Sequence, residues 1–91
     1  MLLTASGYGE LTKKILSISD EVCSGRVMMT HEGGYSPVYV PYCGLAVLEE
    51  MSGITTGMQD PYGHAFENLP DQKLSAAQAE RISLVARTHS L

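Results

Sequence analysis

The stretch RVMMTHEGGYSPVYVP, residues 26–41, decides the expected fold because it joins an apolar run to a glycine turn and then to two prolines. Arg26 to Thr30 follows Ser24-Gly25 directly and does not alternate polar with apolar residues. Such a run is typical of a strand covered on both faces, as in a parallel sheet with helices above and below. It is the only convincing strand in the sequence, so its backbone needs partners from other polypeptide.

An amphipathic helix is expected before this strand, from Ala5 to about Cys23. Thr4 or Ser6 is the expected N-cap, and Gly25 can take the left-handed conformation that ends a helix. Apolar residues recur there at spacings of three and four, on one stripe: Tyr8, Leu11, Ile15, Ile18 and Val22. That spacing predicts a helix with one apolar face, and the charged residues fall elsewhere, toward water.

A second helix follows the glycine turn, and the sequence leaves its start open. Ser36 and Pro37 suit an N-cap and first helical position, whereas Pro41 marks the true start if residues 36–40 form a looser leading turn. Helical spacing then continues from Gly44 to Ser52.

The remainder is expected to be a long loop and a last helix. Residues 54–74 are rich in turn-forming residues and lack periodicity. Ser75 and Gln78 then make a capping-box signature for a helix that runs toward the C-terminus. The predicted order is helix, strand, helix, loop, helix, a piece of an α/β fold.

Composition excludes several classes of protein. Ninety-one residues allow one small domain, and the net charge of -4 with six scattered basic residues argues against nucleic acid or an acidic membrane face as partner. No signal peptide or membrane span is evident at sequence level. Cys23 and Cys43 form no CxxC pair and are expected to be reduced thiols, which favours a cytoplasmic protein.

The glycine turn is the candidate site, because binding crevices of open parallel sheets lie beyond the carboxyl ends of the strands. Gly33 and Gly34 let the backbone approach a ligand closely, and Tyr35 follows them on a stiff turn. Its phenol could donate a hydrogen bond to an oxygen that becomes negative during acyl transfer. In the alternative, which the spacing alone favours, the glycines only make a tight turn and Tyr35 packs on the core.

Five residues are candidate metal ligands or acid–base groups: His31, Glu32, His64, Glu67 and His89. None shows the spacing of a zinc site. A lone histidine at a strand end is more often a hydrogen-bonded part of the scaffold.

Three stretches carry a resemblance to a known family: LTASGYGELTKKIL at 3–16, HEGGYSPVYVPYCGLAVLEEMSGITTG at 31–57 and GMQDPYG at 57–63. They resemble the C-terminal part of the zinc-dependent deacetylases, namely class II histone deacetylases, bacterial histone deacetylase-like amidohydrolases and acetylpolyamine amidohydrolases. The likeness covers nearly the whole chain.

The resemblance implies an arginase-like fold and a zinc ion held by two aspartates and one histidine. A substrate acetyl group on lysine or a polyamine would be removed by a zinc-activated water. In that scheme Tyr35 is the catalytic hydrogen-bond donor to the oxyanion, Gly33 and Gly34 shape the substrate-binding wall, and Glu32 matches the acidic residue of the EGGY motif.

The zinc ligands and catalytic histidines of the family belong upstream of the first helix, so residues 1–91 are expected to be a single partial domain of a longer enzyme. No metal ligand is assigned within the chain, and the chain by itself is expected to be inactive. The alternative is a non-enzymatic interaction module, a degenerate deacetylase remnant whose unpaired strand edges could pair with a partner or a second copy. A third reading is an orphan fragment that never folds stably.

Overall fold

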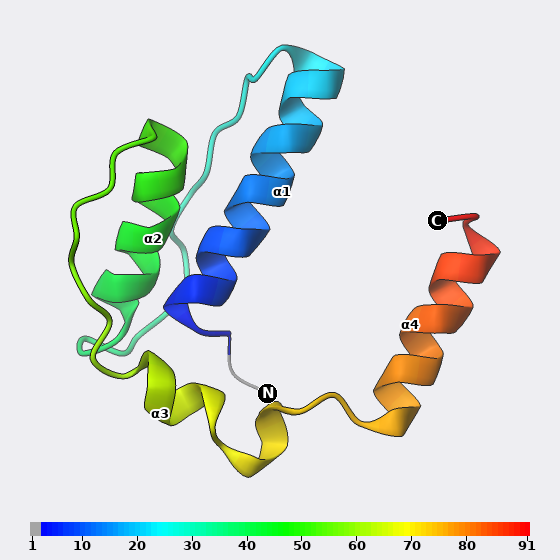
Figure 1. Cartoon of the computed structure of the whole chain (residues 1–91). Coiled ribbons are helices and arrows are strands. Elements are labelled where there is room, and N and C mark those ends of the chain that lie inside the picture. The colour runs from blue at the N-terminus through cyan, green and yellow to red at the C-terminus, as the bar shows by residue number, and fades with distance from the viewer. Residues whose placement is uncertain (1–2) are drawn as a thin grey trace.

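The computed structural model describes residues 3–91, and helices account for all the regular structure within that range (Figure 1). The elements are α1 (Ala5–Cys23), α2 (Val40–Ser52), α3 (Gly63–Glu67), the 3-10 helix η1 (Pro70–Gln72) and α4 (Ala76–Thr88). No strand or sheet is present among these residues. The prediction of an α/β fold with a parallel sheet is therefore wrong for the described chain.

The expected strand, Arg26–Thr30, is an extended segment without a strand partner. Val27 and Met29 are half-buried, whereas Met28 is 87% exposed, so only one face of the segment is covered. A strand needs neighbouring backbone to pair its N–H and C=O groups, and no described segment supplies it. Pairing of this segment with a partner or a second copy stays a prediction.

Helices α1 and α2 pack side by side and run in the same direction (Figure 1). Three contacts show the direction, because the residue numbers rise together along both helices. The Ala5 N–H donates to the Tyr39 hydroxyl, a Cβ built on Gly9 would lie 3.9 Å from that of Ala46, and the Lys13 ammonium lies 3.5 Å from a Glu50 oxygen. A parallel pair requires the chain to return along the length of α1, about 28 Å for nineteen residues, which explains the extended connection.

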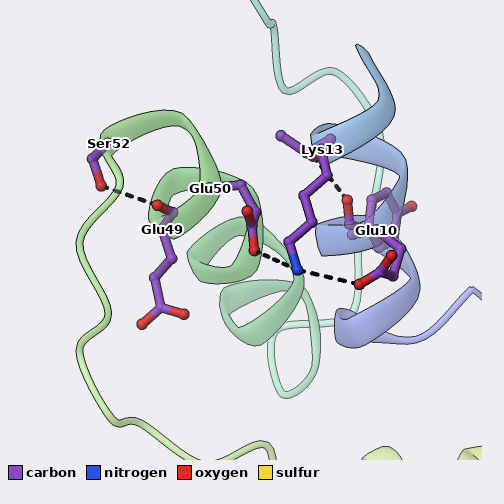
Figure 2. Close-up of polar contacts among 7 residues, drawn as sticks. Glu10, Lys13, Glu49, Glu50 and Ser52 are labelled. Carbon is purple, nitrogen blue, oxygen red and sulfur yellow. Dashed lines mark hydrogen bonds and ion pairs between the residues drawn. The ribbon is translucent and has the colours of Figure 1, made fainter. Parts of the chain in front are cut away.

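Lys13 links the two helices on their solvent side. Figure 2 shows its ammonium between Glu10 of α1 and Glu50 of α2, at 3.2 and 3.5 Å. The hydrogen bond and charge of Glu10, and then those of Glu50, raise the pKa of Lys13. Such exposed ion pairs contribute little to stability, so the packing below them matters more.

The face of α1 that is buried consists of small residues, not of the predicted apolar stripe. Its buried members are Ala5, Gly9, Thr12 and Ser19. The hydroxyls of Thr12 and Ser19 donate to the backbone carbonyls of Tyr8 and Leu16, so both buried groups are satisfied within the helix. Every residue of the apolar stripe is exposed, from 39% at Tyr8 and Ile15 to 74% at Val22.

The predicted helix ends are confirmed where local chemistry sets them. Thr4 Oγ1 accepts the Gly7 N–H at the start of α1, and at its end both the C-cap residue Ser24 and the predicted Gly25 are left-handed, with φ +56° and +74°. Ser75 and Gln78 form the predicted capping box at α4. The second of the two possible starts for α2 is correct, because the helix begins at Val40 after a leading turn.

The segment 54–74 is not wholly a loop, since it contains α3 and η1. The Asp60 carboxylate accepts the Tyr62 N–H at 2.8 Å, which forms the turn that leads into α3. Helix α4 stands apart from the α1–α2 pair in Figure 1, and none of its residues is buried. No helix within residues 3–91 combines the length and the apolar character needed to cross a membrane.

Candidate functional site

The turn that carries Tyr35 depends on Gly34. Gly34 has φ +86°, a conformation that residues with a Cβ rarely adopt. A Cβ at this position would also lie 2.9 Å from Val40 Cγ2 of α2, whereas one at Gly33 would meet nothing within 4 Å. Gly34 therefore allows the chain to turn close against the start of α2, and Gly33 lines open space.

Tyr35 projects from this turn into solvent. Its side chain is 92% exposed, and its hydroxyl makes no hydrogen bond to any residue of the described range. The alternative in which Tyr35 packs on a core is not what the structure shows. An exposed phenol on a restricted turn is free to donate a hydrogen bond to a group brought from outside this chain.

A shallow apolar hollow of about 510 Å³ lies beside the turn. It is lined by His31, Val40, Pro41, Gly44, Leu45 and Leu48. His31 is the one ionisable side chain of the lining, and its ring also stands near Gly34. The hollow can receive an apolar group, but its lining offers no set of ligands for a metal.

Three of the other candidate residues, Glu32, His64 and Glu67, have polar contacts with residues other than Tyr35. Glu32 accepts from the Thr30 hydroxyl at 3.4 Å, His64 lies 3.3 Å from the Asn68 amide, and Glu67 accepts from the Ser6 hydroxyl at 3.1 Å. Across residues 3–91, no three His, Cys, Asp or Glu side chains are grouped so as to hold a metal ion. The described residues therefore offer no ligand set for zinc, and the resemblance places the zinc ligands outside this segment.

Tyr39 lies at the centre of a polar cluster that was not predicted from the sequence. The Tyr39 hydroxyl accepts the Ala5 N–H at 2.8 Å and donates to Asp60 Oδ2 at 3.0 Å. Burial raises the pKa of Tyr39, and the hydrogen bond to Asp60 and its charge act in the same direction. Burial and the charge of Asp60 likewise raise the pKa of the nearby Cys43 thiol.

The only sequence signal for this cluster was aromatic residues within turn-rich segments. Nothing in the spacing pairs Tyr39 with Asp60, because the two residues are 21 positions apart and belong to different elements. Cys23 and Cys43 are both free thiols, as expected, and Cys43 is the more buried of the two.

Comparison with known proteins shows that the chain is similar in sequence to part of several longer proteins. The chain is 34% identical over 92 residues to the histone deacetylase-like amidohydrolase of Pseudomonas aeruginosa, a match that covers 100% of this chain and 24% of that protein. The chain is related to the deacetylases. A probable deacetylase of Archaeoglobus fulgidus is 31% identical over 94 residues, 99% of this chain and 26% of the relative.

The deacetylase relationship extends to a plant protein. Histone deacetylase 8 of Arabidopsis thaliana is 31% identical over 78 residues, which is 85% of this chain and 20% of that protein. No protein-family model matches the chain. The family resemblance inferred from the sequence is confirmed, and the chain spans about a quarter of the length of the deacetylases that it matches.

Proposed function

We propose that this chain is the C-terminal segment of a deacetylase that hydrolyses an N-acetyl amide, and that Tyr35 donates a hydrogen bond to the oxyanion formed during that reaction. The relatives named as deacetylases and the amidohydrolase support the reaction class. The observation that carries the role of Tyr35 is its place directly after Gly34, with its phenol 92% exposed and unpaired among the described residues.

The proposed chemistry needs one hydrogen-bond donor from this chain. Attack of a water oxygen on the acetyl carbonyl carbon moves an electron pair onto the carbonyl oxygen, which becomes an oxyanion. A neutral phenol such as Tyr35 stabilises that charge by hydrogen bonding and keeps its own proton. Because residues 3–91 offer no set of metal ligands, no step assigned to them uses a metal. The water would be activated by groups outside the segment.

The names of the relatives support a deacetylation reaction, and the resemblance supplies the proposed substrate class. Acetyl-lysine and acetylated polyamines share the acetyl amide on which Tyr35 would act, so both are proposed substrates. Gly33 and Gly34 would form part of the wall against which that amide lies. We keep the cytoplasm as the proposed compartment, since free thiols persist in reducing surroundings.

A chimeric enzyme tests this function. Residues 1–91 replace the matching quarter of the Pseudomonas aeruginosa amidohydrolase, and hydrolysis of an acetyl-lysine peptide and of an acetylated polyamine is measured. We expect turnover of one or both substrates, and its loss in Tyr35→Phe. Tyr8→Phe is the matched control, because the Tyr8 hydroxyl also has no hydrogen bond within the described residues but lies on α1.

An inactive but folded chimera would contradict the proposed function. It would favour the second candidate, a non-enzymatic interaction module. One observation supports that candidate, namely the exposed apolar stripe of α1, because large exposed apolar surfaces often mark interaction sites. Self-association of the isolated chain, measured by analytical ultracentrifugation, would then be expected.

A further inference from the structure

The position of Tyr35 is set mainly through its backbone, because its side chain is 92% exposed and makes no hydrogen bond or ring contact with a described residue. Upstream, Gly34 lies close against Val40, but neither Gly33 nor Gly34 makes a hydrogen bond with a described residue. Downstream, Ser36 begins a turn in which its hydroxyl accepts the Tyr39 N–H at 3.3 Å and its carbonyl accepts the Val40 N–H at 3.1 Å. Tyr35 is thus attached directly to a hydrogen-bonded turn that ends at Tyr39.

Tyr39 is the first residue after Tyr35 whose side chain is fixed to distant parts of the chain. Its hydroxyl uses both of its hydrogen-bonding functions, as acceptor from Ala5 of α1 and as donor to Asp60. Its ring meets Phe66 edge-on at 4.7 Å and Tyr62 at 6.1 Å between centroids. The residue therefore joins the start of α1, the start of α2 and the turn before α3.

The contact with Ala5 is specific rather than incidental. Ala5 is the first residue of α1, and the first N–H groups of a helix have no acceptor within the helix. The Tyr39 hydroxyl fills that role at 2.8 Å. Asp60 is held in turn by its hydrogen bond from the Tyr62 N–H, so the acceptor of the Tyr39 proton is itself fixed.

We propose that Tyr39, together with Asp60, is a positioning residue that holds the turn carrying Tyr35 at the place where its hydroxyl meets the substrate oxyanion. The inference rests on the proposed function, since it requires Tyr35 to act on the substrate. Loss of the Tyr39 hydroxyl would free the turn to move, and a displacement of about 1 Å at a reacting group can cost about 10²-fold in rate.

A double-mutant cycle in the chimera tests this role. Tyr39→Phe keeps the ring and removes only the hydroxyl. We expect it to lower kcat by about 10-fold or more with KM unchanged, because an interaction made only in the transition state is weakened. In the Tyr35→Phe background the same substitution should have no further effect on kcat, since Tyr39 acts through Tyr35.

Tyr42→Phe is the matched control for the cycle. Tyr42 lies three residues further along α2 and its ring also contacts Tyr62, at 6.0 Å, but its hydroxyl has no hydrogen-bond partner in the range that the structure describes. We expect kcat of this variant to equal that of the unaltered chimera. Equal effects of Tyr39→Phe and Tyr42→Phe would overturn the proposal. The proposal would also be overturned if Tyr39→Phe lowered kcat by the same factor in the Tyr35→Phe background as in the unaltered chimera. Tyr39 would then have a purely structural role.

Amide hydrogen exchange separates the contact from its catalytic effect. In the unaltered chimera the Ala5 N–H should exchange slowly, and Tyr39→Phe should accelerate it while the interior amides of α1 stay unchanged. An Ala5 amide that exchanges equally fast in both proteins would refute the contact and, with it, the inference. A full rate in Tyr35→Phe would instead refute the proposed function and leave the Ala5 contact standing.

Discussion

At the scale of single residues, Tyr35 and Glu49 differ in their hydrogen bonding. Tyr35 has no partner among the described residues, which leaves its phenol available. Glu49, at the end of α2, accepts hydrogen bonds from both the N–H and the hydroxyl of Thr56 at 2.6 Å. The chain after α2 is thereby fastened back onto the helix.

The contact between Glu49 and Thr56 should depend on pH. The hydrogen bonds from Thr56 favour the charged carboxylate and lower the pKa of Glu49 below its ordinary value of 4.5. Their stabilisation is fully present above pH 4.5 and is lost as the pH falls through the lower pKa of the folded state. We expect the Thr56 amide resonance in NMR spectra to titrate with a midpoint below 4.5.

Glu49→Gln should abolish that titration, whereas Glu50→Gln should leave it in place, because Glu50 pairs with Lys13 instead. A midpoint at or above the ordinary value would show that the contact does not form in solution.

At the scale of elements, the sequence predicted what local chemistry determines. The bounds of α1 and the capping box of α4 depend on residues within a few positions of one another, whereas the start of α2 was left open between two alternatives. The buried face of α1 and the state of Arg26–Thr30 depend on which other segments are present, and those predictions were wrong. The contact between Tyr39 and Asp60 could not be predicted for the same reason, since it joins segments 21 positions apart.

In the candidate site too, features set by nearby residues could be predicted and features set by distant segments could not. The need for glycine at position 34 follows from the turn itself, whereas the exposure of Tyr35 does not, because the spacing alone favoured its packing on a core. Which groups face the Tyr35 phenol cannot be read from 91 residues, since the described chain offers it no partner. The role of Tyr35 therefore came from the family resemblance and stays a prediction.

The contact of α1 with α2 at Gly9 gives a prediction for these helices. A Cβ at Gly9 would make an ordinary contact with Ala46 at 3.9 Å, so Gly9→Ala should fit and stabilise α1 by up to about 1 kcal/mol. Gly9→Leu should push the helices apart and cost about 1–3 kcal/mol. The measurement is the thermal midpoint of unfolding of the chimera that carries residues 1–91, followed by circular dichroism.

Gly44 provides the control for this pair, because a Cβ there meets nothing within 4 Å. Both Gly44→Ala and Gly44→Leu should raise the midpoint. If Gly9→Leu also raised it, α1 and α2 would not be packed through Gly9.

At the scale of the whole molecule, residues 3–91 lack a core of large apolar side chains. Ala5 and Cys43 are the buried hydrophobic residues of this range, and no large side chain is fully buried. The radius of gyration is 15.4 Å, against about 12 Å for a compact domain of this length. These features agree with a chain that spans about a quarter of its relatives.

We expect the isolated chain to bind the dye ANS and to lose its helical signal over a broad temperature range, since little apolar surface is buried to make unfolding cooperative. In the chimera the same surfaces would be covered, so dye binding should fall to the level of the parent amidohydrolase. A sharp transition without dye binding in the isolated chain would show that it is a complete domain.

The ratio of kcat between the unaltered chimera and its Tyr35→Phe variant tests the central claim most directly. With the acetylated substrate at saturation, loss of one oxyanion donor should lower kcat by about 10²- to 10³-fold while Tyr8→Phe leaves it unchanged. A Tyr35→Phe variant that turns over at the full rate would contradict the assignment of Tyr35 to the reaction.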